Sequence, residues 1–238
     1  MKGDLAIDIE SVEIFSTLGK AELNRIISVS EVKTFSKRQI ILEKNRPSDG
    51  LYICLSGRLQ GIDYTIDGRE AGLYFVTPGE FFGELALVDK KVHAEHVLAT
   101  VTSTVMTVPS AICSDLLRFN ANFSNQLAIA LANRVRLLIR QRTLLTLPNP
   151  MQRLSAQLIE LSKSSQQNLV IEFIPTHLEL AMMINASRET VTRAFRTLQI
   201  EGIVKRDGDR LVLQRRVVLE QMAEGQMDVG TPKENPEQ

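Results

Sequence analysis

The stretch from residue 176 to residue 198, THLELAMMINASRETVTRAFRTL, constrains the fold more than any other part of the chain. Thr176 is a good N-cap for a first helix, and Ser187 can cap a second helix after the apolar periodicity is interrupted. The residues at helical spacing that would point inward are Leu178, Ala181 and Met182 in the first helix and Val191, Phe195 and Leu198 in the second. Two short helices joined by a tight turn, the second with a polar outer face, predict a helix-turn-helix.

The outer face of the second helix suits the edges of DNA bases. It carries Arg188, Glu189, Thr192, Arg193 and Arg196. An arginine can donate two hydrogen bonds to guanine and a carboxylate can accept one from cytosine, so we expect base reading from Arg188, Glu189 and Arg193. The spacing of Glu189 and Arg193 would also allow them to brace each other on one helix face.

Hydroxyl side chains near the two helix starts suit phosphate contacts, which position a protein on DNA without reading its sequence. These residues are Ser187 and Thr190, and Thr176 joins them in the predicted DNA-binding set. The alternative interpretation is a charged, solvated helix on an ordinary bundle.

A predicted β-hairpin follows the second helix. Gly202 ends the helix, and IVKRDGDRLVL then has the pattern of a strand, an Asp-Gly turn and a second strand. This hairpin would be a wing, with Lys205, Arg206 and Arg210 available to the DNA backbone. The combined pattern TxxxLAxxxxxSRETVxRxxxxLxxEGI resembles the winged helix-turn-helix of the CRP/FNR regulators, and its SRETVxR run resembles the cyclic-AMP receptor protein branch in particular.

The resemblance, which covers about Ser11 to Gln214, implies a function. Members of this family are cytoplasmic bacterial transcription regulators that pair into homodimers and bind palindromic double-stranded DNA, here with half-sites similar to TGTGA. It also implies RNA polymerase as a partner. The sequence contains no recognisable nucleophile–base pair or paired-carboxylate site, so we expect no enzyme. The alternative function is a nucleotide-second-messenger sensor that acts through a protein partner, with the winged helix as its interaction surface.

The charge balance limits how DNA could be bound. The net charge of the chain is zero, so it is no generally basic coat for nucleic acid. Residues 151–216, however, contain ten Lys/Arg against seven Asp/Glu, which predicts a local basic patch and moderate salt dependence. Cys54 and Cys113 are expected to be buried free thiols, too few for the four-cysteine iron–sulfur cluster of the oxygen-sensing branch. The N-terminus has neither a signal peptide nor a membrane-span pattern.

The N-terminal half changes to short β-rich runs between Val32 and Pro109, separated by turns at Pro47–Gly50, Ser56-Gly57, Asp67-Gly68 and Pro78-Gly79. This pattern predicts an antiparallel sandwich or barrel. LYICLSGRL, PGEFF and GELAL make it resemble the cyclic-nucleotide-binding β-roll. The expected α+β architecture is therefore a β-roll sensor at 1–109, a dimerisation helix at 110–147, a winged helix-turn-helix at 148–216 and a disordered tail at 217–238, with Pro148-Asn149-Pro150 as the hinge.

Apolar residues between 110 and 147 repeat every seven positions in two ladders. A stripe sustained over three heptads predicts a long helix that pairs with a copy of itself. The expected dimer residues are Phe123, Leu127, Ala130, Leu131, Leu137, Leu138, Leu144 and Leu145. The alternative is a single helix packed only on its own sandwich.

The candidate effector pocket begins at the GELAL run. In family members that bind cyclic AMP, the matching glycine admits the phosphate and the matching glutamate accepts a ribose hydroxyl, and Gly83 and Glu84 fit these positions. The alternative is that they only preserve a β-roll turn. The arginine and serine that should follow are replaced by His93 and Ala94, or by Ala94 and Glu95 with a longer loop. The candidate pocket residues are Gly83, Glu84, Leu85, Ala86, His93, Ala94, Glu95, Leu138 and Ile139.

These departures argue against cyclic AMP. A carboxylate repels a phosphodiester, and the family's adenine-contacting Thr-Ser pair is replaced by Leu138 and Ile139. Three interpretations stay open: a different effector in the same pocket, a dinucleotide such as cyclic di-GMP bound elsewhere, or no effector. His93 and His96 in a loop leading into a strand would fall on opposite faces, so we predict no metal or haem site.

Overall fold

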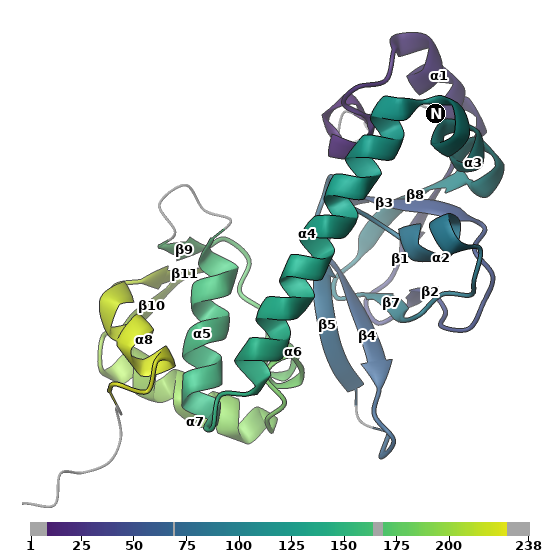
Figure 1. Ribbon diagram of the computed structural model, residues 1–238. Coiled ribbons are helices and arrows are strands. Elements are labelled where there is room, and N and C mark those ends of the chain that lie inside the picture. The colour runs from purple at the N-terminus through teal and green to yellow at the C-terminus, as the bar shows by residue number, and fades with distance from the viewer. Residues whose placement is uncertain (1–8, 69, 164–168, 228–238) are drawn as a thin grey trace, which may run out of the picture. The chain divides into compact units, whose positions relative to one another are not determined.

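The computed structural model describes residues 9–68, 70–163 and 169–227 (Figure 1). It consists of two compact units, Met1–Arg136 and Leu137–Gln238. Antiparallel sheets and helices in both units confirm the predicted α+β class. Within the described residues, no helix is both long enough and apolar enough to cross a membrane.

The first unit is built around two antiparallel four-stranded sheets, with strand orders β1-β8-β3-β6 and β2-β7-β4-β5. The strands are β1 (Glu31–Phe35), β2 (Ile40–Leu42), β3 (Gly50–Ser56), β4 (Leu59–Tyr64), β5 (Glu70–Val76), β6 (Phe81–Phe82), β7 (His96–Ala99) and β8 (Ser103–Pro109). Their inner faces enclose an apolar core that includes Tyr52, Leu59, Phe82, Val97 and Val105. Together the sheets form the predicted roll.

Helices cover one side of this roll and form a second core with it. The helical elements of this unit are two 3-10 turns (Ile9–Ser11 and Glu13–Phe15), α1 (Lys20–Val29), α2 (Glu84–Asp89), α3 (Ser110–Phe119) and the start of α4 (Ala121–Leu145). Phe15 and Phe123 stack with their ring centroids 6.2 Å apart. Cys54 and Cys113 are buried free thiols, as predicted, and burial raises their pKa values to about 12 and about 11.

The sequence predicted one helix after Pro109, but the structure has two, α3 and α4. Asn120 is extended (φ −119°, ψ 99°) and separates α3 from α4. Its side-chain oxygen accepts a hydrogen bond from the Phe123 backbone N–H at 3.0 Å, and its amide donates to Glu22 at 3.1 Å. An asparagine that can cap the next helix start therefore interrupts the apolar pattern.

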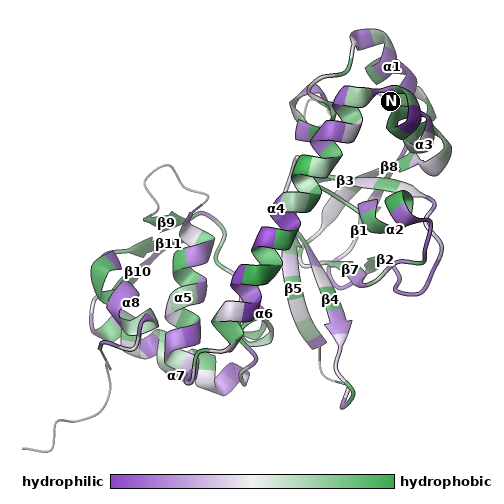
Figure 2. Cartoon of the chain, in the orientation of Figure 1, coloured by the Kyte–Doolittle hydropathy of each residue, from purple (hydrophilic) through white to green (hydrophobic). Residues whose placement is uncertain are grey.

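The two apolar ladders of α4 face different ways. Phe123, Leu127 and Leu144 are buried within the single chain, so assigning them to a contact with a second copy was wrong. Leu138 (55% exposed) and Leu145 (43% exposed), from the other ladder, are open to solvent. Adjacent residues of an α-helix are separated by about 100°, so two neighbouring ladders point in different directions. Figure 2 shows hydrophobic residues along the length of α4.

In its described residues, the second unit contains the end of α4, four further helices and a three-stranded sheet of order β10-β11-β9. Their bounds are α5 (Pro150–Ser162), β9 (Val170–Ile171), α6 (His177–Met183), α7 (Arg188–Ile200), β10 (Val204–Asp207), β11 (Arg210–Leu213) and α8 (Arg216–Ala223).

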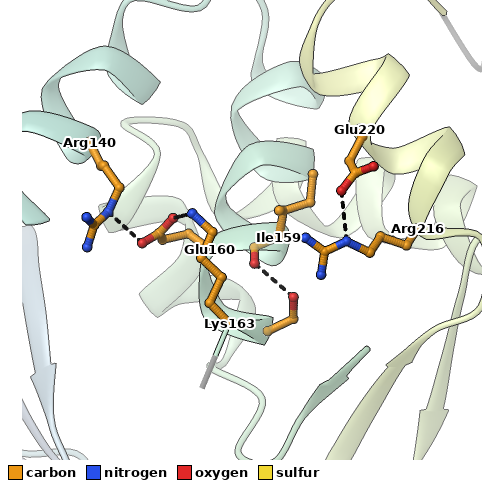
Figure 3. Close-up of polar contacts among 7 residues, drawn as sticks. Arg140, Ile159, Glu160, Lys163, Arg216 and Glu220 are labelled. Atoms are coloured by element: carbon orange, nitrogen blue, oxygen red, sulfur yellow. Dashed lines mark hydrogen bonds and ion pairs between the residues drawn. The ribbon is translucent and has the colours of Figure 1, made fainter. Parts of the chain in front are cut away.

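The last turns of α4 belong to this second unit, so the boundary between the units lies upstream of the expected hinge. Arg140 forms an ion pair with Glu160 of α5 at 2.7 Å (Figure 3), and the Gln141 amide donates to the Met183 carbonyl at 2.9 Å. Pro148 and its neighbours do end α4, since the Asn149 side chain caps α5 by accepting from the Gln152 N–H at 2.8 Å.

The tail expected to be disordered from residue 217 instead begins with α8. Leu219 and Met222, at i and i+3, are both buried, and α8 packs against α5. Arg216 forms an ion pair with Glu220 one turn later, at 2.8 Å (Figure 3). The part of the predicted tail at residues 228–238 lies outside the described residues.

Candidate nucleic-acid interface and effector pocket

The first helix of the predicted helix-turn-helix is α6, which begins with a capping box. The Thr176 hydroxyl accepts a hydrogen bond from the Glu179 N–H at 3.2 Å, and the Glu179 carboxylate accepts one from the Thr176 N–H at 2.5 Å. The inward residues are Leu180, Ala181 and Met183. The prediction was wrong for Leu178, which is 49% exposed, and right for Ala181.

The turn between α6 and α7 is set by two short polar residues. Asn185 adopts a left-handed backbone conformation (φ 49°), which asparagine tolerates better than most residues. The Ala186 N–H then donates to the Ala181 carbonyl at 3.0 Å. Ser187 caps α7, as expected, by accepting from the Thr190 N–H at 3.1 Å.

The two faces of α7 lie as predicted. Val191, Phe195 and Leu198 are buried. The exposed residues are Arg188, Glu189, Thr192, Arg193 and Arg196. The structure therefore brings the predicted base-reading side chains onto one exposed helix.

No ion pair within 4.0 Å joins Glu189 and Arg193 in the described part of the chain. The pKa of Glu189 is lowered mainly by hydrogen bonds from its own backbone N–H and from Ser187 at the helix start, and to a smaller extent by the charges of Arg188 and Arg193. Glu189 is thus an ionised acceptor on the exposed face.

A residue that sequence reasoning missed, His177, contacts this face from α6. Its Nδ1 lies 2.9 Å from the Thr192 hydroxyl oxygen, and its ring centroid lies 5.0 Å from that of Phe195. Because the Thr192 hydroxyl donates to the Arg188 carbonyl at 2.8 Å, Nδ1 of His177 is the donor to Thr192. Burial, followed by the nearby Arg188 and Arg206, lowers the pKa of His177.

The expected wing is the hairpin of β10 and β11, which pair from Val204 with Leu213 to Asp207 with Arg210. Lys205 and Arg206 are exposed. Arg210 is less available than expected, because it forms an ion pair with Glu172 at 2.6 Å.

In the roll, the predicted effector residues begin at a left-handed Gly83 (φ 82°). A Cβ there would lie 2.8 Å from the ring of Tyr52, so the position requires glycine. Glu84 follows at the start of α2 with its side chain only 3% exposed. Burial raises the pKa of Glu84, and Arg134 opposes that rise.

The partner of Glu84 is Arg134 of α4, which the sequence analysis did not single out. The Arg134 Nε lies 3.0 Å from the Glu84 carboxylate, and its Nη2 donates to the Phe81 carbonyl at 2.8 Å. The guanidinium also lies 4.4 Å from the ring centroid of Tyr74. Tyr74 in turn donates to Glu95 at 2.8 Å, over a Gly61 whose missing Cβ leaves room for the ring.

The structure therefore assembles only part of the predicted pocket. Glu84 and Glu95 meet through Arg134 and Tyr74. His93 is buried, its Nε2 has no hydrogen-bond partner among the described residues, and burial lowers its pKa.

The other predicted pocket residues have different environments. Leu85 and Ala94 are exposed, and Ala86 is buried. Leu138 and Ile139 lie beyond the last residue of the first unit. No group of His, Cys, Asp and Glu that could hold a metal occurs in the described residues.

The polar centre of the roll holds two carboxylates, Glu84 and Glu95, and one guanidinium, Arg134. A phosphate placed there would meet carboxylates, and the Arg134 guanidinium is already paired with Glu84.

Comparisons with known proteins define the class of each part. Residues 32–119 match the family model "Cyclic nucleotide-binding domain", and residues 152–222 match "Crp-like helix-turn-helix domain". The chain is thus built as a cyclic-nucleotide-binding type of roll followed by a Crp-like DNA-binding module.

Relatives with both parts give the family. The chain is 26% identical over 212 residues to the cyclic AMP receptor protein of Thermus thermophilus, covering 89% of this chain and 97% of that protein. It is similar in fold to FixK2 of Bradyrhizobium japonicum (TM-score 0.73, 21% identity, 82% of this chain and 97% of that chain). It is also similar in fold to the c-di-GMP responsive regulator CLP of Xanthomonas campestris (TM-score 0.66, 20% identity, 82% and 99%). The chain belongs to the CRP/FNR family of DNA-binding transcription regulators.

We predict that His177 makes DNA affinity depend on pH. Its pKa is lowered in the free protein, so it is neutral near pH 7, whereas nearby DNA phosphates would favour its protonated form. DNA binding then takes up a proton, and affinity should rise as the pH falls from about 7.5 to about 6. Fluorescence anisotropy of His177→Gln should show a shallower pH dependence; an unchanged slope would contradict the prediction.

We predict that Arg134→Gln destabilises the first unit by about 3 kcal/mol at neutral pH, because it leaves Glu84 buried without its countercharge. The pKa of Glu84, already raised, should rise further. Protonation of Glu84 removes the cost of its unpaired buried charge. The difference in free energy of unfolding between variant and parent should therefore become smaller as the pH falls toward about 5.

The measurement is urea unfolding followed by tyrosine fluorescence, since the three tyrosines, Tyr52, Tyr64 and Tyr74, all lie in the first unit. The double variant Glu84→Gln/Arg134→Gln is the control and should recover most of the loss. If Arg134→Gln lowers the free energy of unfolding equally at neutral pH and at about pH 5, loss of the ion pair is not the cause.

Proposed function

We propose that the protein acts as a homodimer that binds a palindromic, TGTGA-like DNA site. Arg188, Glu189 and Arg193 read base edges, while Ser187, Thr190, Thr192, Arg196 and Thr176 contact the backbone or neighbouring groups. The observation that carries this proposal is the exposed polar face of α7, held by a buried apolar face and a serine cap. Two copies would place these faces in successive major grooves, roughly 34 Å apart.

The dimer contact in this proposal is the exposed side of α4. Its apolar members lie three, four and seven residues apart, the spacing of a coiled-coil seam. They are Ala128, Ala132, Val135, Leu138 and Leu145. Val135 and Leu138 are each 55% exposed, which is unusual for large apolar side chains one turn apart on a helix.

In the proposed domain division, residues 1–109 are the sensor roll, 110–147 the dimerising helices and 148–216 the DNA-binding module, extended here by α8. The hinge is placed within α4 near Arg136, because the last turns of that helix are fastened to α5 and α6.

The sensor roll is proposed to work without cyclic AMP. Arg134 already fills the site beside Glu84, and Glu95 adds a second carboxylate where a phosphodiester would lie. A relative is named for cyclic AMP and a similar structure for c-di-GMP, so both ligands belong in the test.

The test is fluorescence anisotropy of a labelled TGTGA-type palindrome with the full chain, alone and with cyclic AMP, cyclic GMP or cyclic di-GMP. Tight, salt-sensitive binding without any ligand supports the proposal. Binding that appears only with cyclic AMP would overturn the effector part. Absence of specific DNA binding, together with tight nucleotide binding, would favour a sensor that acts through a protein partner.

We predict that Arg188→Ala and Arg193→Ala each cost about 1–3 kcal/mol of binding to this palindrome and relax its sequence preference. Each removes a candidate bidentate contact to guanine. Arg118→Ala, an exposed arginine on α3, is the matched control and should bind like the parent. Parent-like affinity of the α7 variants would contradict the assigned readers.

We predict that Val135→Glu/Leu138→Glu is monomeric and binds the palindrome at least about tenfold more weakly, because the second half-site is no longer tethered. Carboxylates on the apolar side of α4 would have to be buried unpaired in the dimer. Sedimentation velocity measures the oligomeric state. Ile66→Glu, an exposed apolar residue elsewhere, should remain dimeric, and a dimeric double variant would place the interface on another surface.

A further inference from the structure

The second unit contains a cavity that the DNA-binding role does not use. It has a volume of about 260 Å³ and lies between the last turns of α4 and α5. Its apolar wall consists of Leu137, Ile139, Leu144, Leu147 and Ala156. A space of this size and lining approaches that of sites for small organic molecules, which combine apolar walls with a few placed polar groups.

One polar group in the wall has no partner. Gln157 is only 2% exposed and lines the cavity, and its side-chain oxygen accepts no hydrogen bond from any described residue. A buried amide oxygen without a donor costs free energy, so a donor from a bound molecule would be favoured.

The charged groups at the edge are paired with one another. Glu160 binds Arg140 at 2.7 Å through one carboxylate oxygen and Lys163 at 2.5 Å through the other (Figure 3). Since both oxygens of this carboxylate are taken, the cavity offers no unpaired acid to a cationic ligand.

We propose that this cavity binds a small, uncharged, largely apolar molecule that donates one N–H or O–H hydrogen bond to Gln157. The site is separate from the roll, because every lining residue lies in the second unit. A bound molecule touches both the end of α4 and α5, so it tightens the packing that holds these helices together.

The ligand test compares indole with 1-methylindole, a matched pair that differs in the donor N–H. Methyl NMR spectra of the full chain, with labelled isoleucine and leucine, are recorded during titration with each compound. Indole should shift the methyl signals of Ile139, Leu144 and Leu147. 1-Methylindole should bind at least about tenfold more weakly, because it leaves Gln157 without a donor. Absence of shifts with indole at millimolar concentration overturns the proposal.

Two variants test the assigned contact. Gln157→Leu should remove the preference for indole over 1-methylindole, whereas Gln199→Leu, the same change at an exposed site on α7, should keep it. Ala156→Met should fill the cavity and abolish binding of both compounds while the protein stays folded. Retained preference in Gln157→Leu, or unchanged binding in Ala156→Met, places the indole elsewhere and overturns the proposal.

Discussion

The helix α4 must satisfy several different environments along one continuous axis, and the arrangement of the chain depends on how its faces are divided. Phe123 packs into the core of the first unit, and Arg134 enters the roll against Glu84. Arg140 binds the second unit through Glu160. Because α4 turns through about 100° per residue, these contacts leave another side exposed, and that side is apolar around Leu138.

The helix-turn-helix was predictable because its determinants are local. Caps such as Ser187 act on N–H groups within one turn, and the inward residues of α7 follow the helical period. The same reasoning was wrong for α6, where it predicted Leu178 as the first buried leucine and the buried one is Leu180. A helix of only seven residues offers too few apolar positions to fix which face is buried. The same reasoning also missed α8, which has only eight residues and packs on α5.

The centre of the roll could not be predicted in the same way, because its partners are distant in sequence. Glu84 was identified from its motif, but Arg134 lies fifty residues later, among other polar residues of a long helix. Nothing local distinguishes Arg134 from Arg136, which is exposed. Tyr74 and Gly61 likewise meet only because β4 and β5 pair. A residue's burial here is set by strand pairing and helix packing, which a single sequence does not display.

The charge at the centre of the roll bears on how a regulator of this class can be controlled. A ligand shifts a conformational equilibrium only through different affinities for the two states. In this chain the guanidinium of Arg134 already makes the polar contacts to Glu84 and the Phe81 carbonyl from within the same polypeptide. This contact is made within one polypeptide, so it holds α4 on the roll without any ligand, and a ligand entering the roll would have to compete with it. A small molecule bound outside the roll meets no such competition, and the cavity beside Gln157 touches the other end of α4.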